Sequence, residues 1–285
     1  RCADLEKNYL RLTTEPDPDR VRPQQILEKS MALVLKKYHE SRNYSYVINQ
    51  FKSIRQDLTV QHIKNDFTIH VYETNARVSL ENNDLGEFNQ CQSQLKLLYY
   101  QKRKENKPLQ FYGSEVEFLI YRFIYMMMTS NCGEIYKLKM TFLKEYSKYN
   151  KTKKEKSLFE FIDDLFQVNQ DILLGNYHSF FKIVGEEKFD VPLAYQLLNN
   201  YISNKNRVKA LCTIAKSYRT ITSQFIIDEL QFKNLTNLVK FLKEYGLSDF
   251  LVDDLQGFDC LGSRHLLADI IQRPDFKKVD IKGQI

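Results

Sequence analysis

The chain has 285 residues, of which 43% are hydrophobic and 27% charged, an ordinary composition for a globular protein. Only 9 glycines and 6 prolines interrupt it, which favours long helices and argues against an all-β fold with its many turns. The formal net charge of +6 permits an anionic partner without requiring one. No apolar run reaches the roughly 18 residues of a membrane span, so no membrane contact is expected.

Residues that could carry catalysis or bind metal do not form recognisable motifs. The five cysteines are far apart and include no Cys-x-x-Cys pair, so neither zinc nor a disulfide framework is expected, and a reducing compartment fits best. The chain contains no phosphate-binding glycine motif, no His-Glu-x-x-His and no Gly-x-Ser-x-Gly. We therefore expect a non-catalytic protein without metal or cofactor. Because it begins with Arg1 rather than Met, we expect a piece of a longer protein.

The first part of the chain reads as an extended lead-in followed by stacked helices. Residues 1–20 are polar, with two prolines close together, which predicts an extended segment. Phe67, Ile69 and Val71 alternate as in a strand, but the length of the surrounding segment favours a helix that ends near Asn82. Helical pairs stacked as in tetratricopeptide repeats are the predicted architecture for residues 21–204. In chain order the remaining expected helices are Ile26–His39, Tyr44–Leu58, Leu85–Tyr99, the apolar and buried Val116–Met128, Glu134–Tyr149, Leu158–Leu174, Tyr177–Val184 and Pro192–Ile202.

From residue 205 the pattern changes to that of a winged helix, expected to extend to residue 272 and to be followed by a tail, 273–285. The order is helix, short strand, helix, helix and hairpin, which is typical of this variant of the helix-turn-helix. The fold class is therefore all-α. The expected elements are a helix through Val208–Tyr218, a strand at Thr220–Thr222, a helix with Ser223 as its N-cap, a helix over Leu235–Tyr245, and a hairpin of Phe250–Val252 with Phe258–Leu261.

The chain contains a set of characteristic segments, which are Leu10–Thr13, Glu15–Pro18, Ser53–Gln61, Phe67–Thr68, Val71–Tyr72–Glu73, Glu87–Cys91, Gly175–Tyr177, Phe180–Phe181 and Lys209–Leu211. Together these segments resemble the SAC3/GANP family, and within it the subgroup of fungal Thp-three and animal leukocyte-receptor-cluster-member-eight proteins. The resemblance implies a PCI-like module, in which helical repeats precede a winged helix that packs beside a partner's winged helix.

The resemblance also implies a setting. It points to a nuclear complex with a PCI-domain protein resembling COP9-signalosome subunit twelve, completed by a very small acidic protein of the Dss-one/Sem-one type. The implied roles are transcription elongation, pre-mRNA splicing and messenger export.

Three groups of basic residues are candidate contacts for an RNA or DNA backbone. The sharpest is a lysine stripe on one expected helix, where ~100° per residue brings its four members within about 60°. A second group lies at a helix end, where it also complements the helix dipole, and a third lies on the last winged-helix helix. The three groups are Lys137, Lys144, Lys148 and Lys151; Lys102, Arg103 and Lys104; and Lys240 and Lys243. A solvated helix face is the alternative for the stripe.

The hairpin is the candidate partner surface. Its aspartates, such as Asp253 and Asp254, would repel phosphate, so it is expected to face a protein. The apolar residues expected to contact that partner are Phe250, Val252, Phe258 and Leu261. Arg55 and Asp57 lie in the densest family segment, and their expected role is structural. The leading hypothesis is thus a scaffold that also binds nucleic acid, and the alternative is a purely protein-binding PCI scaffold.

Overall fold

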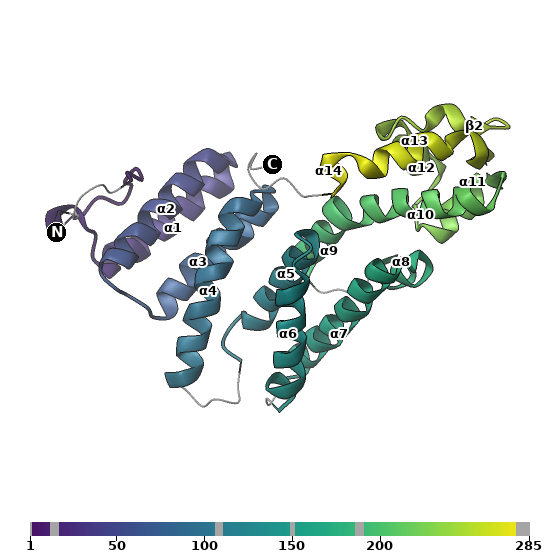
Figure 1. Ribbon diagram of the computed structural model, residues 1–285. Coiled ribbons are helices and arrows are strands. Elements are labelled where there is room, and N and C mark those ends of the chain that lie inside the picture. Colours follow the sequence, from purple (N-terminus) through teal and green to yellow (C-terminus); the bar gives the residue numbers. More distant parts are fainter. Residues whose placement is uncertain (1, 12–16, 106–110, 149–151, 186–190, 278–285) are drawn as a thin grey trace. The chain divides into compact units, whose positions relative to one another are not determined.

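The computed structural model describes residues 2–11, 17–105, 111–148, 152–185 and 191–277 (Figure 1). It is predominantly helical, with one small sheet near the C-terminal end, so the expected all-α class is confirmed. Contacts divide the chain into two compact units, unit 1 (Arg1–Glu115) and unit 2 (Val116–Ile285). The boundary expected between the helical stack and the winged helix, at 204/205, lies inside unit 2.

Unit 1 is a stack of successive helices, each packed against the next: α1 (Gln24–Ser41), α2 (Tyr44–Val60), α3 (Asp66–Glu81) and α4 (Leu85–Glu105). Asn43 and Asn65 cap the N-termini of α2 and α3, because the side chain of each accepts a hydrogen bond from the main-chain N–H of the third residue of its helix. Phe67–Val71, whose apolar residues alternate as in a strand, lies within α3, as the length of the surrounding segment predicted. The core of unit 1 is formed by buried apolar side chains from α1 and α2, together with Val71 and Val78 of α3.

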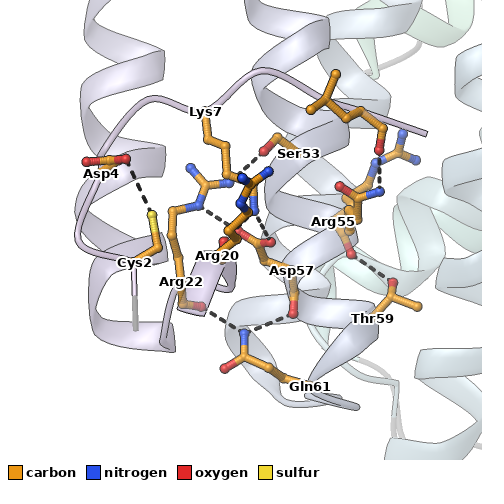
Figure 2. Close-up of polar contacts among 12 residues, drawn as sticks. Cys2, Asp4, Lys7, Arg20, Arg22, Ser53, Arg55, Asp57, Thr59 and Gln61 are labelled. Carbon is orange, nitrogen blue, oxygen red and sulfur yellow. Dashed lines mark hydrogen bonds and ion pairs between the residues drawn. The ribbon is translucent and has the colours of Figure 1, made fainter. Parts of the chain in front are cut away.

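Arg22 and Asp57 form an ion pair in the interior of unit 1 (Figure 2). The Arg22 side chain is fully buried, and its Nε donates to Asp57 Oδ2 over 2.6 Å. The Arg22 guanidinium also donates to Ser53 Oγ over 2.8 Å and to Ser30 Oγ over 3.2 Å. Gln61 Nε2 donates to the main-chain oxygens of both Arg22 and Asp57. The chain that enters α1 is thereby fixed to α2.

Residues 2–11 form an arm that lies along α1 and α2. Lys7 Nζ donates to the second oxygen of Asp57 over 2.6 Å, so this carboxylate accepts from two cations (Figure 2). The main chain of the arm is held by side-chain amides of α2: Lys7 N–H donates to Gln50, Tyr9 N–H to Asn49, and Gln56 donates to the Leu10 carbonyl. The expected lead-in is therefore docked on the first two helices.

Arg55 makes a second set of buried polar contacts between α2, α3 and α4. It donates to Glu87, whose side chain is fully buried, and its guanidinium lies 5.5 Å from the centre of the Tyr72 ring. It also lies 3.3 Å from the Cys91 sulfur, and burial raises the pKa of that thiol to about 12. The thiol is therefore protonated and unreactive at neutral pH. Arg55 and Asp57 both act within the fold.

Unit 2 begins with a helical stack whose elements are α5 (Glu115–Met128), α6 (Cys132–Lys144), a 3₁₀ turn η2 (Tyr146–Lys148), α7 (Lys153–Leu174), α8 (Tyr177–Gly185), α9 (Pro192–Leu197), the π-helical η3 (Leu198–Ser203) and α10 (Asn204–Ser217). The core includes edge-to-face Phe123 and Phe166, at 4.8 Å, and stacked Phe142 and Phe159, at 4.9 Å. The helix expected to reach Tyr149 instead ends at Lys144. The backbone turns at Glu145, and Tyr146 is buried.

The winged helix follows in the expected order. Its elements are α10, β1 (Thr220–Thr222), α11 (Ser223–Glu229), α12 (Leu235–Glu244), the 3₁₀ turn η4 (Ser248–Phe250), β2 (Leu251–Val252), β3 (Gly257–Asp259), α13 (Cys260–Gln272) and α14 (Pro274–Lys277). The antiparallel sheet has the order β1-β3-β2, which places Phe258 between Ile221 and Leu251. Two details differ from expectation. Thr222 rather than Ser223 caps α11, and Cys260 and Leu261 begin α13 instead of extending the strand.

Candidate nucleic-acid and partner surfaces

The lysine stripe is shorter than the sequence predicted. Lys137 and Lys144, seven residues apart on α6, share a helix face, and both are exposed. Lys148 lies at the end of the separate turn η2, and Lys151 lies outside the described residues. Lys137 forms an ion pair, because its Nζ lies 2.8 Å from Glu134 Oε1. The prediction that one helix carries all four lysines is therefore wrong, because α6 ends at Lys144.

Sequence reasoning missed the exposed non-polar side chains beside these lysines. Tyr136 and Leu143 on α6 are 65% and 57% exposed. Lys139 Nζ lies 5.5 Å from the centre of the Phe166 ring. An exposed tyrosine between lysines can stack on a base while the ammonium groups approach phosphates. The sequence does show an aromatic residue among lysines here, because Tyr136 directly precedes Lys137 and Lys139 follows two residues later.

Two members of the second basic group are engaged inside unit 1. Lys102 Nζ lies 2.9 Å from Asp66, and this hydrogen bond raises the pKa of Lys102. Arg103 pairs with Glu115, and both side chains are largely buried. These two residues tie the end of α4 to other parts of the unit, which indicates a structural role, and their contact with nucleic acid stays a prediction. Lys104 remains exposed and lies 4.7 Å from the centre of the Tyr100 ring.

The third basic group lies on the outer face of α12. Leu238, Phe241 and Leu242 are buried on one side of this helix, while Lys240 and Lys243 are exposed on the other. Neither lysine has a salt-bridge partner among the described residues, and the same holds for Lys144 and Lys148. These four ammonium groups are therefore available to an external anion.

The hairpin presents a different apolar surface from the one expected. Phe258 is fully buried at the centre of the sheet, so it cannot contact a partner, and that assignment is corrected. Phe250 and Val252 are half-buried. Leu261, at the start of α13, is 52% exposed, and Leu255, in the turn between β2 and β3, is 42% exposed. Sequence reasoning missed Leu255 because it lies in the turn rather than in a strand.

The turn that carries Leu255 has an unusual backbone. Asp253, Asp254 and Leu255 all have positive φ, at 53°, 51° and 71°. Residues other than glycine rarely adopt this conformation, and although aspartate tolerates it better, it costs leucine roughly 1–2 kcal/mol. The turn holds an exposed leucine beside two exposed carboxylates, a combination suited to a partner with an apolar patch bordered by positive charge.

The described residues bring together no group of three or more His, Cys, Asp or Glu side chains that could hold a metal ion. None of the helices in the described part of the chain is long and apolar enough to cross a membrane.

Comparison with known proteins decides the family. The sequence model of the SAC3/GANP family matches residues 7–249, from the arm on α2 to η4 of the winged helix. The chain belongs to the SAC3/GANP family. The match ends before β2 and β3, so the exposed leucines of the hairpin and α13 lie outside the part that defines the SAC3/GANP match.

Individual relatives match all or most of the chain. It is 37% identical to Protein THP3 of Saccharomyces cerevisiae and 35% identical to the THP3 homolog C2A9.11c of Schizosaccharomyces pombe, in both cases over 100% of this chain. It is 35% identical over 94% of its length to the leukocyte receptor cluster member 8 homolog of Xenopus laevis. The chain spans 59%, 66% and 31% of these three proteins, respectively.

Proposed function

We propose that this chain is a non-catalytic scaffold subunit of a nuclear complex that acts in transcription-coupled mRNA processing, including elongation, splicing and export. In this proposal its winged helix pairs with a PCI-domain protein resembling COP9-signalosome subunit twelve. A small acidic protein of the Dss-one/Sem-one type joins them. Membership of the SAC3/GANP family and the likeness to THP3 support the setting.

The nucleic-acid part of the proposal rests on one observation. Lys144, Lys148, Lys240 and Lys243 are exposed and have no carboxylate partner among the described residues. A lysine without a carboxylate partner can bind a phosphate without first breaking an ion pair. Its binding releases counterions from the nucleic acid, which favours the complex. Contacts of this kind do not read bases, so binding should be independent of sequence and sensitive to salt.

Charge reversal of these four lysines tests that binding. Changing Lys144, Lys148, Lys240 and Lys243 to Glu should weaken binding of unrelated RNA and DNA oligonucleotides by at least about tenfold at low salt, because each change replaces attraction with repulsion. The slope of log affinity against log salt should become shallower, by about 0.7 for each lost contact to a single strand. Fluorescence anisotropy titrations of the partner complex at several salt concentrations measure both quantities.

A matched control keeps net charge out of the comparison. Lys29, Lys36, Lys64 and Lys216 are also exposed, and their change to Glu alters the total charge equally. The control should retain most of the affinity. Equal losses in both variants would reduce the effect to overall charge, and an unchanged affinity in the first variant would favour the purely protein-binding scaffold.

The partner surface is tested on the exposed leucines. Leu255→Asp and Leu261→Asp together should reduce co-purification of a PCI-type partner severalfold, because they place charge in an apolar contact. Neither change should harm folding. Aspartate tolerates the positive φ of position 255 better than leucine, and position 261 is in the first turn of α13, where a carboxylate is favourable. Leu97→Asp, at an equally exposed leucine of α4, is the control, and an equal loss there would remove the hairpin from the interface.

A further inference from the structure

A small pocket opens on unit 2 at the turn between α7 and α8, where these helices meet α10. Asp171 of α7 forms part of its lining, together with the apolar Ile172, Phe180 and Ala210. Asn206 and Lys209 of α10 also line it. It is separate from the lysine surfaces and from the exposed leucines of the hairpin, so it has no role in the function proposed above.

The Asp171 carboxylate is only half satisfied. The residue is 1% exposed. Its Oδ1 accepts from Gln167 Nε2 over 3.0 Å and from Asn176 Nδ2 over 3.4 Å. Its Oδ2 is buried and has no hydrogen-bond partner among the described residues. A buried acceptor left without a donor is costly, and more so when it carries charge.

The position of Asp171 in its helix adds to that cost. It lies in the last turn of α7, which ends at Leu174, and none of the residues in that turn is basic. The C-terminal end of a helix carries a partial negative charge, which disfavours a nearby carboxylate. Asn176 relieves only Oδ1 of Asp171, because its amide nitrogen donates there over 3.4 Å while its own Oδ1 accepts from Ser179 N–H at the start of α8. Oδ2 therefore lacks a donor, and a cationic donor would stabilise this carboxylate most.

The geometry points to a lysine side chain of a partner protein as the occupant, with its ammonium group paired to Asp171 Oδ2. One free oxygen suits the point charge of an ammonium, whereas a guanidinium would be expected to engage both oxygens. The apolar side chains of Ile172, Phe180 and Ala210 match the four-carbon stem of lysine. Beside Asp171 in sequence, Leu173 and Leu174 are 65% and 72% exposed, an apolar surface that a protein segment would cover and a free amine would not.

The pocket chemistry can be tested with n-butylammonium, which reproduces the lysine side chain, by NMR titration of the full chain. The side-chain amide resonances of Gln167 and Asn176, which report on Asp171, should shift and saturate. Neutral 1-pentanol should produce no such shift. Asp171→Asn should weaken the binding by about tenfold or more, because it removes a charged hydrogen bond and keeps the shape. Lys209→Gln should leave it unchanged or tighter.

Three outcomes would overturn the proposal. Absence of saturable shifts in both the wild type and Lys209→Gln would mean that only water serves Asp171. Shifts seen only in Lys209→Gln would mean that Lys209 of the same chain fills the pocket. Equal shifts with 1-pentanol would mean that the pocket selects apolar shape rather than charge.

A peptide separates a partner segment from a free amine. Acetyl-Leu-Lys-Leu-amide should bind more tightly than n-butylammonium, and replacing its lysine with norleucine should abolish the shifts at Asn176. Leu174→Ser should weaken the peptide severalfold and leave n-butylammonium unchanged. If Leu174→Ser affects neither probe, or both equally, the exposed leucines take no part and the docking proposal is wrong.

Discussion

Asp57→Ala should lower the free energy of unfolding of unit 1 by about 3–5 kcal/mol, because it leaves the buried guanidinium of Arg22 without its carboxylate. The cost comes from an uncompensated charge rather than from the loss of one hydrogen bond. Lys7 loses its partner as well, but its side chain is 25% exposed and can turn to water. Urea denaturation followed by circular dichroism measures the total change, and hydrogen exchange locates it in α1 and α2.

A paired substitution distinguishes charge from packing. Arg22→Met combined with Asp57→Leu removes both charges and roughly keeps the volume, so it should recover much of the stability lost in the single variant. If the double variant is as unstable as Asp57→Ala, the contacts of Arg22 with Ser30 and Ser53 carry the stability instead.

Phe258→Ala should destabilise the winged helix by about 3–5 kcal/mol, because the ring is fully buried in the central strand of its sheet. Amide exchange should accelerate in β1, β3 and α13 while α1–α4 remain protected. Leu261→Ala removes an exposed side chain and should change the stability by less than about 0.5 kcal/mol. Protection that stays normal throughout the winged helix of Phe258→Ala would contradict the assigned burial.

Most of the fold could be predicted from local signals. Helical spacings located the helices, and the order of short elements after residue 205 identified the winged helix, although Thr222 rather than the expected Ser223 caps α11. The end of α6 could not be predicted, because neither glycine nor proline marks it. The chain turns at Glu145, and Tyr146 is buried, so tertiary packing overrides local helix propensity there.

The candidate surfaces were harder to predict for a related reason. A run of residues such as Lys102–Lys104 shows its charges, but not that Asp66 and Glu115, far away in sequence, neutralise two of them. Phe258 and Leu261 looked equivalent in an apolar hairpin, and only the strand order shows that the first is central and the second lies outside the sheet. Gln167 and Asn176 both donate to Oδ1 of Asp171 and leave Oδ2 without a donor, and the sequence pattern does not reveal this.

The arm should tolerate substitutions at some of its positions, because α2 holds it by its main chain. Gln50 and Asn49 of α2 accept from the main-chain N–H groups of Lys7 and Tyr9, which every amino acid except proline supplies. Gln56 donates to the Leu10 carbonyl, which every amino acid supplies. Sequence drift at the exposed positions 8 and 10 should therefore be nearly neutral. The three amide side chains on the helix should be intolerant to change, although they are ordinary polar residues, because each of them holds the main chain of the arm rather than one of its side chains.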